Sequence, residues 1–218
     1  HRQSPRGTPQ GGVASPLLSN LYLDTIDHFV AQTFSREEVR WVRYADDALL
    51  MCRRNVRGVY AAVKTKIEAL GLTVNAEKTK RTDVRETGFD FLGFHFAWRE
   101  SLLNRGRFYS YIFPARPSEV RLREKVRKKT SQRAPIPPEE FVAQINEIIR
   151  GWAEYYRHTS ASKSFHTAQR FVNRRVRSYL MKRGKRRGRG YRPYPDGYLY
   201  QKLGLINLTA KGWVRCAH

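Results

Sequence analysis

Cysteine is scarce in this sequence, which has only Cys52 and Cys216 among 218 residues. Their number and spacing indicate neither a disulfide framework nor a zinc site, and the six histidines are scattered. No apolar run approaches the ~20 residues that span a bilayer. These shortages argue against a disulfide-stapled secreted domain, a zinc module and a membrane partner. They favour a reducing, intracellular setting: cytoplasm, bacterial nucleoid or organellar matrix.

Acidic residues are also in short supply, and unevenly so. The chain carries a formal charge of +23. Residues 1–100 hold 15 Lys and Arg against 12 Asp and Glu, a net charge of +3, whereas residues 101–218 hold 27 against 7, a net charge of +20. Such asymmetry indicates a polyanionic partner held mainly by the second half. Because hydropathy disfavours a membrane, we predict that this partner is nucleic acid.

Two adjacent carboxylates, Asp46 and Asp47, lie between two strand-like runs, residues 39–44 and 48–52. The first run alternates and the second is apolar, as in a hairpin with the carboxylates at or near its turn. Carboxylates this close repel each other unless a cation neutralises them. Hard oxygen ligands in a basic protein indicate Mg²⁺ and phosphate chemistry. An Asx turn that simply closes a hairpin is the alternative.

The run Tyr44-Ala45-Asp46-Asp47 looks like the active-site hairpin of reverse transcriptases. Four further motifs stand in the order that this resemblance requires: RGTPQGGVASPLLSNLYLD (6–24), GLTVNAEKTK (71–80), FLGF (91–94) and IRGWAEYYR (149–157). The ordered set resembles the palm and thumb of group II intron reverse transcriptases, the intron-encoded maturases, and their bacterial relatives.

The resemblance implies RNA-directed DNA synthesis. A primer 3′-hydroxyl would attack the α-phosphate of a dNTP between two Mg²⁺ ions about 3.5–4 Å apart, with Mn²⁺ as a substitute. Asp46 would ligate metal directly and Asp47 would support it. Lys78 would lie near the triphosphate and protonate the pyrophosphate, or would be an ordinary surface lysine. The implied partners are intron or template RNA, a DNA or RNA primer, and dNTPs.

Two short segments would contact template or primer. The glycine-rich loop before residue 13 has small residues that permit a strand to approach, although an ordinary glycine turn is the alternative. The run at 91–93 resembles the primer grip, where glycine lets a backbone pass closely; its aromatics could equally be core. The candidates are Pro9, Gln10, Gly11, Tyr44, Phe91, Leu92 and Gly93.

Basic residues beyond residue 164 form the candidate RNA face, since each phosphate neutralised releases counterions. Tyrosines follow the basic run at 182–192, a mixture suited to structured or single-stranded RNA. A solvated tail is the alternative. The candidates are Arg170, Arg174, Arg175, Arg177, Lys182, Arg183, Lys185, Arg186, Arg187 and Arg189.

The hydrophobic pattern predicts an α+β fold. Before residue 114 we expect a helix at 15–34 capped by Ser15, the hairpin, a helix at 56–70 closed by Gly71, a short strand at 72–74, and a second hairpin of 89–98 with 108–113. Three helices, at about 117–129, 138–156 and 164–183, should then form a small bundle. With the resemblance, residues 1–113 become the C-terminal part of a right-hand polymerase palm, with antiparallel hairpins backed by helices. Residues 114–218 become a basic three-helix thumb, or maturase (X), domain.

The family's palm also needs a third aspartate on a strand upstream of the Pro9–Gly12 loop, and fingers that grip the nucleotide. The chain starts at His1, and its remaining aspartates do not match that motif. We therefore expect upstream fingers and palm, in cis or in trans, to complete the enzyme. Two alternatives stay open: a non-catalytic RNA-binding maturase or splicing cofactor, and a reverse transcriptase that serves a CRISPR or phage-defence system.

Overall fold

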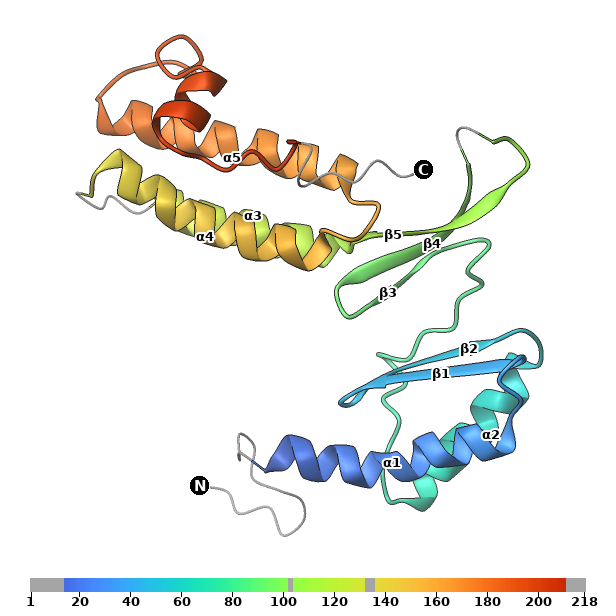
Figure 1. The fold of residues 1–218 in the computed structure, drawn as a ribbon. Coiled ribbons are helices and arrows are strands. Elements are labelled where there is room, and N and C mark those ends of the chain that lie inside the picture. Colours follow the sequence, from blue (N-terminus) through green and yellow to red (C-terminus); the bar gives the residue numbers. More distant parts are fainter. Residues whose placement is uncertain (1–13, 102–103, 132–135, 211–218) are drawn as a thin grey trace. The chain divides into compact units, whose positions relative to one another are not determined.

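The computed structural model describes residues 14–101, 104–131 and 136–210 (Figure 1). The chain forms two compact units, residues 1–81 and 82–218. Each of the two units contains α-helices and antiparallel strands, so the predicted α+β class is confirmed. No helix in the described ranges is both long and apolar enough to cross a membrane.

The first unit is a two-stranded antiparallel sheet covered on one face by two helices (Figure 1). Its elements are α1 (Ser15–Thr33), β1 (Val39–Tyr44), β2 (Asp47–Cys52) and α2 (Val56–Ala69). Because side chains alternate along a strand, every second residue of β1 packs against the helices. The buried core comprises Ile26, Val30, Val39, Val59 and Val63. The predicted hairpin and both predicted helices are therefore present.

Two local predictions for the first unit are wrong. Ser15 lies inside α1, and Ala14 takes the cap position without a side-chain hydrogen bond. The strand expected at 72–74 is absent, although Gly71 does follow α2 with a φ of +71°. The amide of Leu72 donates instead to the carbonyl of Ile67 at 3.3 Å, which ends the helix. The amide of Leu72 is therefore not available for a strand–strand hydrogen bond at the start of 72–74.

The second unit starts with a three-stranded antiparallel sheet, β3 (Phe89–Phe91), β4 (Phe94–Glu100) and β5 (Phe108–Pro114), in that spatial order. The expectation of one continuous strand over 89–98 is wrong. The chain reverses at Leu92 and Gly93, whose φ values of +50° and +82° are those of a tight two-residue hairpin turn. The primer-grip candidates therefore sit in and beside a turn.

The three helices predicted after residue 114 are all present: α3 (Arg116–Ser131), α4 (Pro138–Tyr156) and α5 (Ser162–Arg183). Their apolar stripes form one buried core, to which the largest fully buried contributors are Phe141, Ile145, Ile149 and Phe165. A π-helix, η1 (Tyr198–Lys202), was not predicted. It places Leu199 in the same core, so the segment after α5 packs back onto the helices (Figure 1).

Candidate active site and nucleic-acid interface

The carboxylate pair lies at the tip of the first hairpin. The last residue pair of the ladder is Tyr44 with Asp47, so Ala45 and Asp46 form the loop. Ala45 has a φ of +52°, in the left-handed region that favours glycine. The tight loop pushes both aspartates outward, and both are exposed. Tyr44, 67% exposed, shares the outer face of the sheet with Asp47.

Two exposed carboxylates provide hard oxygen donors of the kind that Mg²⁺ prefers. Within the described ranges, no group of three or more His, Cys, Asp or Glu side chains is placed to hold a metal. Asp46 and Asp47 therefore fit a magnesium site in chemistry, as part of a ligand set that further groups must complete.

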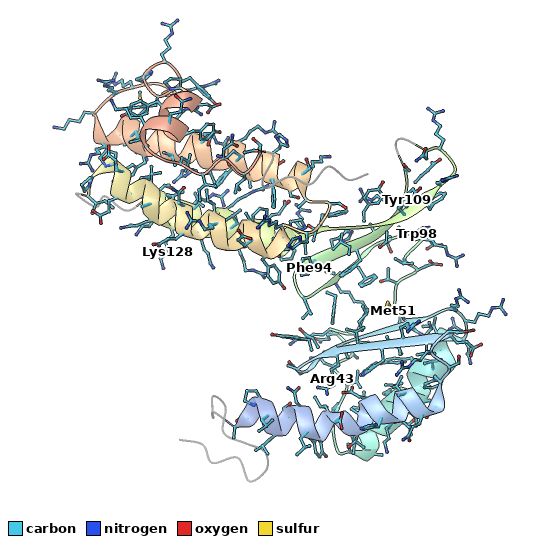
Figure 2. The ribbon with its side chains drawn as sticks, in the orientation of Figure 1. Arg43, Met51, Phe94, Trp98, Tyr109 and Lys128 are labelled. Carbon is cyan, nitrogen blue, oxygen red and sulfur yellow. The ribbon has the colours of Figure 1, made fainter. Side chains whose placement is uncertain are left out.

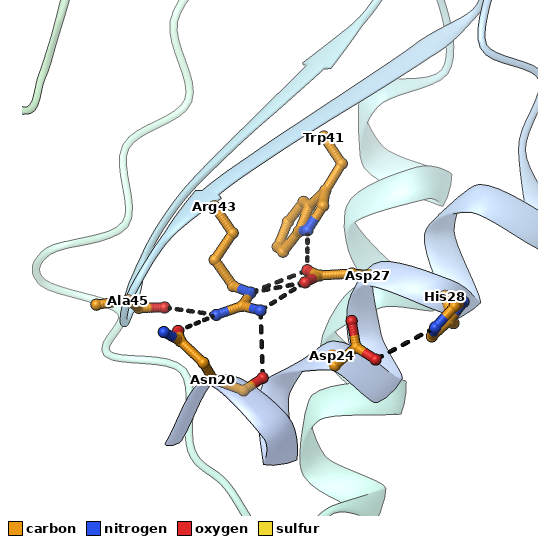
Figure 3. A network of polar contacts seen from close by, with 7 residues as sticks. All are labelled: Asn20, Asp24, Asp27, His28, Trp41, Arg43 and Ala45. Carbon is orange, nitrogen blue, oxygen red and sulfur yellow. Dashed lines mark hydrogen bonds and ion pairs between the residues drawn. The ribbon is translucent and has the colours of Figure 1, made fainter. Parts of the chain in front are cut away.

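A polar network holds the tip end of this hairpin against α1 (Figure 3). The guanidinium of Arg43 donates to both carboxylate oxygens of Asp27, with Nε–Oδ1 at 2.9 Å and Nη2–Oδ2 at 2.5 Å. Its Nη1 donates to Asn20 Oδ1 at 3.0 Å and to the carbonyl of Ala45 at 3.1 Å. Trp41 Nε1 adds a bond to Asp27 Oδ1 at 2.6 Å. The side chain of Arg43 thus links α1 to the backbone of the Ala45–Asp46 loop.

Asp27 and Arg43 stabilise each other's charged forms. Burial by itself raises the pKa of Asp27, but hydrogen bonds from Arg43 and Trp41 and the Arg43 charge outweigh it and hold that pKa below its ordinary value. The hydrogen bonds that Arg43 donates to Asp27 in turn raise the pKa of Arg43. The pair is therefore ionised at neutral pH, and the side chain of Arg43 is only 12% exposed.

Sequence reasoning missed Asn20, Asp27 and Arg43. A signal was available: Asn20 and Asp27 are seven residues apart, two helical turns, and so share one face of α1. Arg43 alternates onto the inward face of β1 with Val39 and Trp41. Polar groups on two facing surfaces indicate a pair, but only the fold shows that these surfaces meet.

Other palm candidates are located as follows. Lys78 is exposed in a turn, where its amide donates to Asn75 Oδ1 at 3.1 Å. Phe91 ends β3 opposite Phe94. Pro9, Gln10 and Gly11 lie outside the described residues.

The basic residues of α5 divide into exposed and interior groups. Arg170 and Arg174 are exposed. Arg175 is half-buried and donates to Thr130 Oγ1 at 2.6 Å; burial and the neighbouring arginines lower its pKa. Arg177 is 2% exposed, donates to the carbonyl of Tyr194 at 2.8 Å and pairs with Asp196. Its guanidinium thus holds the segment after α5 rather than facing solvent.

The basic run at 182–189, which comprises the last two residues of α5 and the segment after it, is exposed to solvent at its cations. All six of its candidates are exposed: Lys182, Arg183, Lys185, Arg186, Arg187 and Arg189. A second basic surface, not predicted as an RNA site, lies on α3, where Lys125, Lys128 and Lys129 line an open depression together with Ile148 of α4. Lys128 is labelled there in Figure 2. Spacings of three and four residues place the lysines on one helix face.

Two family models match the chain. The model for reverse transcriptase (RNA-dependent DNA polymerase) matches residues 1–96. The model for the group II intron, maturase-specific domain matches residues 120–194. The two matched regions follow each other in the order that the five motifs predict.

Two curated proteins are also similar to the chain. Protein YkfC of Escherichia coli K12 is 31% identical over 148 residues, which cover 51% of this chain and 38% of the relative. The "Uncharacterized 91 kDa protein in cob intron" of Schizosaccharomyces pombe is 20% identical over 239 residues, covering 76% of this chain and 30% of the relative. The chain thus spans between 30% and 38% of the length of these relatives. Residues 1–96 thus match the reverse transcriptase family and residues 120–194 match the maturase-specific domain of group II introns, so the predicted resemblance to group II intron reverse transcriptases and maturases is confirmed.

Proposed function

We propose that this chain is part of an RNA-directed DNA polymerase of the group II intron type, with residues 1–113 as palm and 114–218 as thumb. The observation that supports this most is the exposed Asp46–Asp47 pair at a hairpin tip, inside the region that matches reverse transcriptases. A hairpin that needs only to close does not require two solvent-exposed carboxylates, nor a largely buried arginine that bonds the carbonyl of the loop residue Ala45.

Asp46 and Asp47 would hold divalent metal, Mg²⁺ or Mn²⁺, together with a third carboxylate supplied from outside the described residues. The metal supplies charge stabilisation at the attacking and leaving oxygens of nucleotidyl transfer. The remaining work belongs to side chains of this chain. Arg43 fixes the loop through the Ala45 carbonyl, Tyr44 presents an exposed ring to the primer–template, and Lys78 offers an exposed proton donor to the pyrophosphate.

The basic surfaces of α3 and of the basic run at 182–189 would bind template or intron RNA. Lysines bind phosphate as point charges, and arginines bind it in a bidentate manner. Both surfaces lie in or beside the maturase-specific region, and the half of the chain that contains them carries most of the positive charge. RNA held there would be delivered to the polymerase as template or, in a splicing role, held as intron.

The direct test is primer extension by the full-length protein on an RNA template with dNTPs. We expect extension with Mg²⁺, none after chelation by EDTA, and recovery on adding Mn²⁺, because the carboxylates need a cation to act on phosphate. Product length on denaturing gels measures the result. A full-length protein that binds RNA but extends no primer with either metal would contradict the polymerase proposal.

A second candidate function, an RNA-binding splicing cofactor without polymerase activity, is favoured by the maturase-specific match over residues 120–194. The two functions differ in their need for the carboxylate pair. Splicing of intron RNA that persists in an Asp46→Ala, Asp47→Ala double variant, with no extension by wild type, would support the cofactor.

Neutralising the α3 surface should weaken RNA binding in a salt-dependent way. We expect Lys125→Gln, Lys128→Gln and Lys129→Gln together to flatten the slope of log affinity against log salt by about 2, since each phosphate contact contributes roughly 0.7–0.9. The matched control removes three charges from α2 by Arg57→Gln, Lys64→Gln and Lys66→Gln, and should change the slope little. Fluorescence titration at several salt concentrations decides, and equal slopes for the two variants would refute the assignment.

A further inference from the structure

The turn between β3 and β4 is tied to the last turn of α4. The hydroxyl of Tyr155 donates to the carbonyl of Leu92 at 2.9 Å, and the hydroxyl of Tyr156 donates to the carbonyl of Gly93 at 2.9 Å. Each turn carbonyl thus accepts from one of two adjacent tyrosines that lie 63 residues away in sequence, and the carbonyl of Gly93 accepts in addition from the amide of Ala115 at 2.9 Å. Two successive residues of one helix hold two successive residues of one turn.

A relay of hydrogen bonds supports the inner tyrosine. Tyr156 Oη lies 2.7 Å from Ser118 Oγ, and Trp152 Nε1 donates to Ser118 Oγ at 3.2 Å. Ser118 therefore accepts from Trp152 and donates to Tyr156, whose own proton is left for the carbonyl of Gly93. Burial raises the pKa of Tyr156, which keeps that proton in place. The relay runs from the body of α4, through α3, to the turn.

Packing reinforces the hydrogen bonds. The ring of Phe94, the first residue after the turn, stacks on Tyr155 with centroids 4.8 Å apart and meets Tyr156 edge-on at 5.0 Å. Phe94 is labelled in Figure 2 where the sheet meets the helices. A Cβ on Gly93 would come within 3.0 Å of the Tyr156 hydroxyl, in a backbone conformation that side chains already disfavour. The close approach of turn and helix therefore requires glycine at this position.

The contact joins two regions that match different family models. Leu92 and Gly93 lie in the segment that matches reverse transcriptases, whereas Tyr155 and Tyr156 lie in the segment that matches the maturase-specific domain. The same helix α4 contributes Ile148 to the basic depression with the three lysines of α3. One rigid helix therefore contacts the candidate primer grip at its end and borders the candidate RNA surface along its side.

We propose that Tyr155 and Tyr156 are positioning residues for the primer end, which let the maturase-specific helices set the position of the Leu92–Gly93 turn. This inference rests on the proposed polymerase function. The two hydroxyls fix the turn carbonyls, and with them the backbone against which the primer 3′ end would lie. RNA bound along α3 and α4 then acts on primer placement through a direct structural connection.

The test removes only the two hydroxyls, by Tyr155→Phe and Tyr156→Phe in the full-length protein, singly and together. The rings and their stacking stay in place. The matched control is Thr167→Val, which removes a hydroxyl that donates to the carbonyl of Lys163 at 2.9 Å in the same unit, on α5 rather than at the turn. Thermal unfolding verifies that every variant is folded.

The first readout is hydrogen exchange of the amides of residues 89–96, which does not depend on activity. We expect faster exchange there in the double variant and no change in the control. The second readout is the rate of first-nucleotide addition on a saturating primer–template. We expect a ten- to hundred-fold decrease, as for a misplacement of about 1 Å, with an unchanged KM for dNTP and unchanged RNA affinity.

The outcomes separate the two hypotheses. A wild-type protein that extends no primer would overturn the proposed function itself. If the wild type extends primers and the double variant adds the first nucleotide equally fast, the positioning role is overturned while the polymerase stands. Unchanged exchange at 89–96 would overturn the anchor. An equal loss of rate in Thr167→Val would show a general effect of destabilisation and would also overturn it.

Discussion

Asp46→Ala should reduce Mg²⁺-dependent primer extension by at least about a thousand-fold. Metal ions contribute several kcal/mol of charge stabilisation to the transition state, and each 1.4 kcal/mol or so corresponds to a factor of ten in rate. Asp46 lies in the two-residue loop, fully outside the strand ladder, so its removal leaves the hairpin hydrogen bonds intact. We expect RNA affinity to stay within about twofold of wild type, because the loop lies in the nearly neutral half of the chain.

Steady-state extension rates and RNA titrations measure both effects. The matched control is Glu68→Ala, which removes an exposed carboxylate of the same unit, paired with Lys64 on the surface of α2 at 3.6 Å. That variant should extend primers at the wild-type rate. Normal extension by Asp46→Ala would refute the polymerase mechanism, and a parallel loss of RNA binding would show that the residue supports the fold rather than the chemistry.

Arg43→Leu should lower the rate of primer extension by about ten- to hundred-fold. That is the usual effect of losing a group that does not bind the metal itself but orients the residues that do. The guanidinium bonds both the Asp27 carboxylate and the Ala45 carbonyl next to Asp46. Without it the loop can move, so we expect half-maximal activity to require a higher Mg²⁺ concentration. A purely structural role would lower the unfolding temperature without changing that requirement.

Arg40→Leu is the matched control, since Arg40 is exposed on the opposite face of the same strand, paired with Met51. It should change neither the Mg²⁺ requirement nor the rate. Rescue offers a further check: Arg43→Lys retains the charge but cannot reach Asp27, Asn20 and Ala45 at once, and should recover only part of the activity. Full activity of Arg43→Leu at low Mg²⁺ would contradict the positioning role.

The pH dependence of stability tests the same network from its acidic partner. The pKa of Asp27 in the folded protein lies below its ordinary value of 3.8. Its contribution is therefore present above the unfolded-state pKa and is lost as pH falls through the lower, folded-state pKa. Thermal unfolding should show Asp27→Asn less stable than wild type at neutral pH, with the difference shrinking below about pH 4. A difference that is constant down to pH 2 would contradict the ion pair.

Local patterns in the sequence were enough to predict most elements and the position of the carboxylates. The period of apolar residues located α2 and α4 almost to the residue, since a helix that packs on one side must repeat its apolar positions every 3.6 residues. Alternation in β1 followed by an apolar β2 placed Asp46 and Asp47 at the turn. The uneven charge indicated a nucleic-acid partner. The helices and the turn depend on neighbours within a few residues along the chain, and the charge asymmetry depends on composition alone.

The tertiary structure alone decided which polar groups meet. Arg43 is 16 residues from Asp27, and Tyr156 is 63 residues from Gly93; no period in the sequence encodes either pair. Arg177 stands in the same helix as the exposed Arg170 and Arg174, yet it is buried because Tyr194 and Asp196 return to its side of the helix. A guanidinium enters the interior only where distant parts of the chain offer acceptors for its hydrogen bonds, and those acceptors are placed by the fold as a whole.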